Sequence, residues 1–137
     1  MYSKKAIQTL FLFLFTFLLS TNFDAFSQQI PEVEEGKGLV VFYRSKKFSG
    51  GAIKFTVKDN RGEYGQLTNG SIIYVTVEPG SNTFWSQVIS SDSITIEAEE
   101  GKIYYVKGTV KMGAIAGRPK FNLVNESKAL KELKKLK

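Results

Sequence analysis

Residues 53–58 read IKFTVK, and this short stretch decides the fold. Apolar residues occupy every second position, which is the period of a β-strand with one buried and one solvated face. Residues 94–99, ITIEAE, repeat the alternation. Residues 39–43 (LVVFY) and 72–75 (IIYV) are apolar on both sides, so we predict that they form central strands.

Turn signals separate these runs at a spacing of roughly ten residues, which is typical of sandwiches and barrels. They are rich in Gly, Pro, Asn, Asp and Ser, and they lie at residues 49–51, 59–62, 69–70, 79–80, 90–92 and 99–101. Asn69-Gly70 favours a two-residue type I′ hairpin turn, and Pro79-Gly80 favours a type II turn. We therefore predict an all-β domain over residues 38–125, a single antiparallel β-sandwich of seven or eight short strands.

Residues 126–137 differ from the rest because they contain no Gly or Pro and are rich in Leu, Lys and Glu. Leu130, Leu133 and Leu136 recur every three residues, which predicts a short, basic amphipathic helix that Asn125 can cap. A helix this short is marginal in isolation. We expect it to dock on the sandwich; contact with an anionic surface is the alternative.

The N-terminal segment is typical of an export signal. A basic start at Lys4-Lys5 precedes the uncharged run LFLFLFTFLL at residues 10–19, and Ala25 and Ser27 fit a signal peptidase site. We interpret residues 1–27 as a cleaved signal peptide, with an uncleaved anchor as the alternative, and the polar residues 28–37 as a linker. After cleavage we expect no transmembrane span, and an exported protein in the periplasm, outside the cell or in the cell envelope of a bacterium.

The chain of 137 residues contains neither Cys nor His. This composition excludes disulfides, thiol nucleophiles, imidazole bases and Cys/His zinc sites. The net charge of +6 falls to +5 without residues 1–27, and +3 of it lies in the last twelve residues. We therefore expect no enzyme, no cofactor, no metal, no catalytic residue and no nucleic-acid partner.

The order of strand and turn motifs carries a resemblance. The motifs are VFYR at 41–44, GQLTNGS at 65–71, VEPGSNT at 77–83 and GKIYYV at 101–106. The chain resembles the exported bacterial domains grouped as domain of unknown function 2846, and more remotely PEGA-type repeats. The resemblance implies a β-sandwich of the envelope, often lipidated or secreted, with no enzyme activity. The chain departs from that pattern in having no cysteine for a lipid anchor.

Two functions remain open. The first is a non-enzymatic envelope module that binds a protein or has a structural role. The alternative is a carbohydrate-binding module that uses exposed aromatic residues, for which Trp85, Tyr74 and Tyr64 are the candidates. Trp85 beside Tyr74 would form a flat platform if both point outward, whereas packing into the core is the plainer interpretation. The basic loop at residues 45–51 is either a solvated loop or a contact for an anionic polymer or headgroup.

Overall fold

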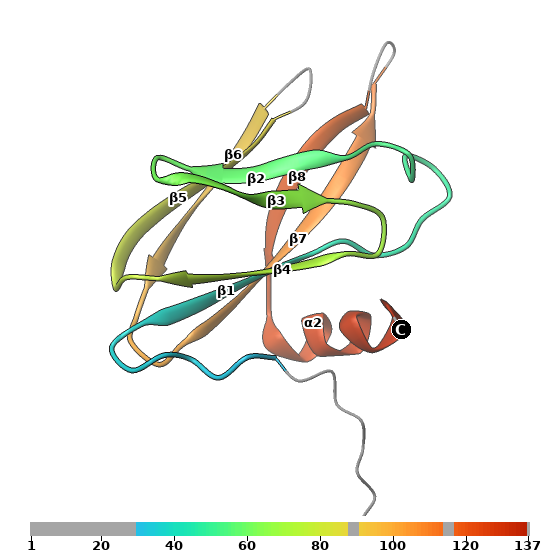
Figure 1. The fold of residues 1–137 in the computed structure, drawn as a ribbon. Coiled ribbons are helices and arrows are strands. Elements are labelled where there is room, and N and C mark those ends of the chain that lie inside the picture. The colour runs from blue at the N-terminus through green and yellow to red at the C-terminus, as the bar shows by residue number, and fades with distance from the viewer. Residues whose placement is uncertain (1–29, 88–90, 114–116, 137) are drawn as a thin grey trace, which may run out of the picture.

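The computed structural model describes residues 30–87, 91–113 and 117–136, so the predicted signal peptide lies outside the described residues. Eight strands form two four-stranded sheets packed face to face (Figure 1). They are β1 (Gly38–Tyr43), β2 (Phe55–Asp59), β3 (Gly62–Leu67), β4 (Ile72–Val77), β5 (Gly80–Gln87), β6 (Ser91–Ala98), β7 (Ile103–Met112) and β8 (Gly117–Val124). The helix α2 (Glu126–Leu133) and the 3-10 turn η1 (Lys134–Leu136) follow. The predicted all-β sandwich with a C-terminal helix is confirmed.

The strand order is β4-β1-β7-β8 in the first sheet and β3-β2-β5-β6 in the second. Neighbouring strands are antiparallel with one exception, because β1 and β7 run parallel. Parallel neighbours need a long connection between them. Here the chain leaves the first sheet after β1 to form β2 and β3 of the second sheet, and it crosses back to place β4 beside β1. It then forms β5 and β6 of the second sheet before it returns to place β7 on the other side of β1.

The turn at Asn69-Gly70 does not close a hairpin, since β3 and β4 belong to different sheets. Gly70 has a φ of +79°, whereas Asn69 does not have a positive φ. The prediction of a type I′ turn, which needs both angles positive, is therefore wrong. Asn69 instead bonds the backbone of Lys47: its Oδ1 accepts from the amide at 2.8 Å and its Nδ2 donates to the carbonyl at 3.0 Å. It ties the turn to the loop between β1 and β2.

The prediction that residues 39–43 and 72–75 are both central strands is half right. β1 lies between two neighbours, but β4 is the edge strand of the first sheet. β4 is apolar on both sides for a different reason, because its outer face is also covered. Ile72 and Tyr74 pack there against a second apolar cluster.

The main core lies between the two sheets. Phe42 is at its centre, fully buried, with its ring centroid 5.0 Å from that of Phe84 and 5.4 Å from that of Phe121. The other buried members are Val40, Phe55, Val57, Leu67, Val75, Val77, Ile96, Ala98 and Val106. Each strand supplies alternate residues to this cluster, as the period of a strand requires.

A second core lies on the outer face of the first sheet, where α2 docks (Figure 1). Ala129 and Leu133 of the helix are buried against the outward side chains of β1 and β7. Asn125 caps the helix by accepting from the amide of Lys128 at 2.9 Å. The docking of the predicted helix on the sandwich is confirmed.

The segment predicted as a linker also reaches this second core. Ile30 and Val33 are half-buried in it, and the carbonyl of Lys37 accepts from the amide of Gly101 at 2.8 Å. From residue 30 onward the segment is therefore part of the domain, and the interpretation as a loose linker is wrong there. No helix within the described ranges is both long and apolar enough to cross a bilayer.

Candidate functional site

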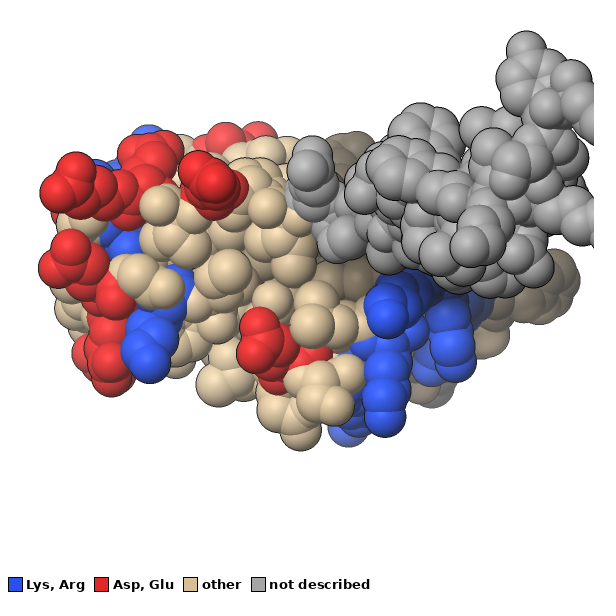
Figure 2. Space-filling view, turned by 90° about the horizontal axis from the view of Figure 1, so that it is seen from below, with Lys and Arg blue, Asp and Glu red and all other residues tan. Residues whose placement is uncertain are grey.

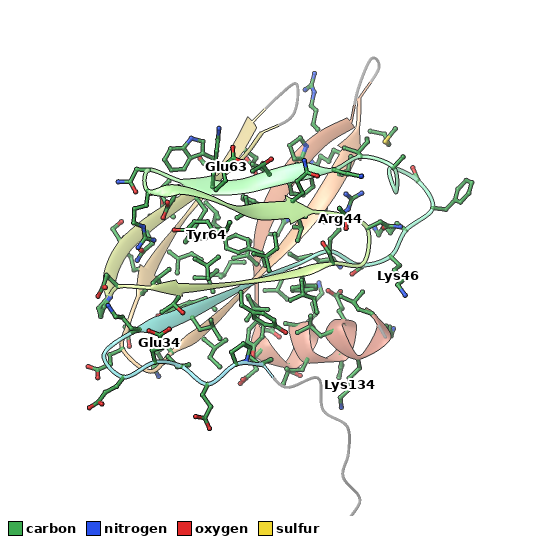
Figure 3. The ribbon with its side chains drawn as sticks, in the orientation of Figure 1. Glu34, Arg44, Lys46, Glu63, Tyr64 and Lys134 are labelled. Carbon is green, nitrogen blue, oxygen red and sulfur yellow. The ribbon has the colours of Figure 1, made fainter. Side chains whose placement is uncertain are left out.

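The three aromatic candidates lie in three different places. Tyr64 points into the main core from β3, with its ring centroid 6.0 Å from that of Phe84 (Figure 3). Tyr74 packs against the second core on the outer face of the first sheet. Trp85 lies on β5 opposite Lys58 and is half-buried on the outer face of the second sheet. A platform of Trp85 and Tyr74 is therefore not formed.

A hollow does lie beside Trp85. It has a volume of about 210 Å³ and is formed by the β2–β3 turn and the beginning of β5. Its lining residues are Asp59, Asn60, Arg61, Ser81, Asn82, Thr83 and Trp85. One aromatic ring thus faces a site whose other walls carry amide, hydroxyl, carboxylate and guanidinium groups.

The β2–β3 turn holds its polar groups in a fixed arrangement. Asp59 Oδ1 accepts from the amide of Arg61 at 2.8 Å, which is the local bond that makes Asp a turn residue. Asp59 Oδ2 accepts from Nε and Nη2 of Arg61 at 2.8 and 2.6 Å and from Tyr64 Oη at 2.7 Å. Tyr64 therefore does not line the hollow, but its hydroxyl orients the carboxylate of Asp59, which does.

These contacts determine the charge of the pair. Burial alone would raise the pKa of the Asp59 carboxyl, whose side chain is only 4% exposed. The bonds from Arg61 and Tyr64 outweigh that effect and hold the pKa below its ordinary value. The bond to Asp59 likewise raises the pKa of Arg61. The site presents a fixed, ionised Asp–Arg pair, with the guanidinium partly exposed.

The opposite wall is positioned by the turn between β4 and β5. Asn82 Nδ2 donates to the carbonyl of Glu78 at 2.9 Å and to that of Gly80 at 3.0 Å. Thr83 Oγ1 lies 2.8 Å from Thr95 Oγ1 on the neighbouring strand. Rigid strands and turns therefore carry every polar group around Trp85, so the hollow is formed before any ligand arrives.

The sequence pattern indicated Trp85 but neither Arg61 nor Asn82, since residues 59–62 have the composition of a plain turn and Asn82 follows the turn at residues 79–80. The spacing of Asp59 and Arg61 could have predicted this pair. An Asp side chain often accepts from the amide two residues later, and such a turn places the two charged side chains next to each other. No sequence signal places Asn82 beside that turn. Among the residues that the structure describes, no group of three His, Cys, Asp or Glu could hold a metal ion.

The fold and this hollow define a small β-sandwich domain with a shallow polar site beside the Trp85 ring. The chain belongs to the family described as "Protein of unknown function (DUF2846)", whose family model matches residues 34–119. This confirms the resemblance drawn from the strand and turn motifs. The matched segment includes the whole hollow and ends within β8, before α2. No curated protein and no solved structure matches the chain.

Proposed function

We propose that this protein is a non-enzymatic, exported module of a bacterial cell envelope that binds carbohydrate in the hollow beside Trp85. The observation that carries the proposal is an indole ring facing a preformed site with a fixed Asp–Arg pair. The charged start and apolar run of residues 1–27 support export. The composition supports a binding role rather than catalysis, since imidazole and thiol groups are missing from the sequence.

A sugar ring fits the chemistry of this hollow. Its axial C–H groups can lie against the indole, and its hydroxyls can both donate and accept. Arg61 supplies donors from its exposed guanidinium, while Asn82 Oδ1 and Thr83 Oγ1 supply oxygen acceptors, because both N–H groups of Asn82 are already bonded to backbone carbonyls. The volume of about 210 Å³ is below the roughly 300 Å³ at which sites for drug-sized ligands begin. We therefore expect one or two sugar units to be held, as part of a longer chain that continues into solvent.

A protein partner is a poorer fit for this face. Stable protein interfaces bury about 800 Å² on each side around an apolar centre. The strands that flank Trp85 present Thr56, Lys58, Thr83 and Thr95 on this surface. The large apolar side chains that the described residues expose are Phe48, Met112, Leu123 and Leu130, and none of them belongs to the second sheet.

Replacing Trp85 with alanine is expected to weaken saccharide binding at least tenfold, because the stacking surface is lost. The wild-type protein would first be screened against arrayed bacterial envelope glycans, and the best ligand would then be titrated by calorimetry. Phe48→Ala removes an exposed aromatic residue elsewhere and should leave the affinity unchanged. Full binding by Trp85→Ala would contradict the proposal. The proposal would also be contradicted if no arrayed glycan bound and cross-linking in cells recovered a protein partner at this face. That result would support the protein-binding alternative.

Export makes a separate prediction. The protein recovered from the cell envelope should begin at Gln28, because Ala25 and Ser27 place small residues at the cleavage site. N-terminal sequencing and intact mass measure this directly. A protein that still begins at Met1 would support the uncleaved anchor instead.

A further inference from the structure

Charge is divided between the two ends of the domain. The acidic end consists of Glu34, Glu35, Glu78, Glu99 and Glu100, all exposed. The backbone segments that carry them are held together at the beginning of β1, where the carbonyl of Lys37 accepts from the amide of Gly101 and the Lys37 ammonium pairs with Glu78. Figure 2 shows most of the carboxylates of this face at the left end, with a few basic residues among them, and a cluster of lysines and arginines at the right.

The basic end consists of Lys46, Lys47, Lys134 and Lys135, all exposed. Lys46 and Lys47 lie in the loop that leaves the end of β1. Glu132 Oε2 accepts from Tyr43 Oη at 2.7 Å, which holds the end of α2 beneath the end of β1. Figure 3 shows Lys46 and Lys134 on the same side of the molecule, opposite Glu34. β1 separates the two ends by about 20 Å, given its six residues.

The loop between β1 and β2 carries a fully exposed aromatic residue at this end. Phe48 is 106% exposed, which is as exposed as a Phe side chain becomes. The loop is nevertheless held at its base, because the buried guanidinium of Arg44 donates to the carbonyls of Ile53 and Gly50. Met112 is 61% exposed and lies next to Gly50. A loop that is held at its base therefore presents an apolar tip directly after two exposed lysines, and the Phe48 ring makes no packing contact that would bury it.

A small hollow at the base of this loop is lined by cations. Its volume is about 30 Å³, and Arg44, Lys47 and Lys107 line it together with the hydroxyl residues Ser45, Ser49 and Thr109. Lys107 is paired with Glu132 at 2.8 Å, whereas the described residues give Arg44 no carboxylate partner. Such a lining of cations and hydroxyls complements a phosphate oxygen.

We propose that the basic end docks on the surface of an anionic phospholipid bilayer, with Phe48 inserted below the headgroups. The lysines face the negative lipid surface, and a phosphate oxygen enters the hollow lined by Arg44 and Lys47. The acidic end then points away from the membrane, so the charge division orients the domain. The exposed ring favours a bilayer over a soluble anionic polymer or an acidic peptide, because only the bilayer offers an apolar phase next to its phosphates.

This docking surface is independent of the carbohydrate site. The Phe48 loop precedes the beginning of β2, whereas the hollow beside Trp85 lies at the end of β2. A domain bound to lipid through Phe48 would therefore hold Trp85 away from the membrane. The two sites can be tested separately, since a variant at one end leaves the other unchanged.

Vesicle sedimentation tests the proposal with the purified exported protein. Binding is expected to vesicles of phosphatidylglycerol and phosphatidylcholine in equal parts, and not to phosphatidylcholine alone. The double variant Lys46→Gln, Lys47→Gln should weaken binding by about five-fold for each lysine removed. Phe48→Ser should weaken it about tenfold. Raising the salt concentration should weaken it further.

The controls come from the other end and the other face of the domain. Lys102→Gln removes an exposed lysine at the acidic end, and Leu123→Ser removes a side chain that is 59% exposed on β8. Neither should change vesicle binding, and Trp85→Ala should not change it either. Because the chain contains no cysteine, Phe48→Cys and Leu123→Cys can each carry a single environment-sensitive fluorophore. Only the label at residue 48 should shift to the blue on vesicles.

Several results would overturn the proposal. Equal binding to both kinds of vesicle would indicate a non-electrostatic anchor, and equal binding by Phe48→Ser would exclude insertion. Tighter binding to polyglutamate than to vesicles would assign the basic end to an acidic protein. Displacement from vesicles by millimolar inorganic phosphate would make the hollow a site for the free anion. Circular dichroism of each variant distinguishes these outcomes from a failure to fold.

Discussion

Replacing Phe42 with alanine is expected to lower the free energy of unfolding by about 3–5 kcal/mol. Phe42 is fully buried in β1, and its ring packs edge-on against Phe84 of the second sheet and tilted against Phe121 of the first. The variant loses the transfer free energy of the ring and leaves a cavity, because the strands on both sides are fixed by their ladders.

Urea unfolding followed by the fluorescence of the single Trp85 measures this effect. The midpoint should fall by about 2–3 M while the slope stays constant, because the same surface is exposed on unfolding. Phe48→Ala is the matched control, since it makes the same substitution at a fully exposed ring and should change stability by less than about 0.5 kcal/mol. A loss below about 1 kcal/mol in Phe42→Ala would show that the two sheets do not pack on this ring.

The strands could be predicted from the sequence because their signals are local. Alternation in residues 53–58 and 94–99 reflects one buried and one wet face, and the observed burial of β2 and β6 follows it. The capped helix could be predicted for the same reason, since Asn125 and Leu133 lie within one segment. The predicted apolar stripe was wrong at Leu130, which is exposed, because Ala129 packs on the sheet instead. The all-β class could therefore be predicted, because the alternation of apolar and polar residues is visible in the sequence of each strand.

The assignment of strands to sheets could not be predicted in this way. Asn69-Gly70 has the residues of a hairpin turn, but the chain crosses there from one sheet to the other. Whether two successive strands pair or cross depends on which faces they bury against the rest of the chain, and not on the turn residues alone. β4 shows the same limit, because an edge strand covered on its outer face has the apolar pattern of a central strand.

The candidate site could be predicted only in part for a related reason. An aromatic residue next to Phe84 on a strand must alternate with it, so one of the pair faces outward, and this is Trp85. The polar walls come from two turns that are about twenty residues apart in the sequence and meet only because β2 pairs with β5. Tyr64 and Tyr74 are equally aromatic, but their strands turn them toward the two cores.

Replacing Glu132 with alanine is expected to lower the free energy of unfolding by about 2 kcal/mol and to release α2 from the first sheet. Glu132 Oε2 accepts from Tyr43 Oη at 2.7 Å, and Oε1 accepts from Lys107 Nζ at 2.8 Å. Tyr43 is fully buried, so the variant leaves its hydroxyl without an acceptor. Alanine itself favours a helix, so the loss does not come from helix propensity.

Chemical unfolding gives the stability, and limited trypsin digestion at the lysines of α2 reports release of the helix. Lys131→Ala is the control for stability, because it changes an exposed neighbour on the same helix. Ser127→Ala is the control for digestion, because it changes an exposed residue of α2 and leaves both of its lysines in place; neither control should differ from the wild-type protein. Adding Tyr43→Phe to Glu132→Ala should recover about 1 kcal/mol, since it removes the buried hydroxyl that was left without a partner. Trypsin sensitivity equal to that of the wild-type protein would contradict this role of Glu132.

The contact of Glu132 with Tyr43 and Lys107 should also be detectable in the pH dependence of stability. Burial alone would raise the pKa of the Glu132 carboxyl, but the bonds from Lys107 and Tyr43 outweigh burial and hold that pKa below its ordinary value. A carboxyl with a lowered pKa in the folded state binds its proton more readily when unfolded. Its contribution is therefore complete above the unfolded pKa of about 4.3 and is lost as the pH falls through the folded pKa. The free energy of unfolding of Glu132→Ala should lose this part of its dependence on acid pH, whereas that of Lys131→Ala should retain it. Parallel pH profiles for the wild-type protein and Glu132→Ala would show that the carboxylate does not hold the helix.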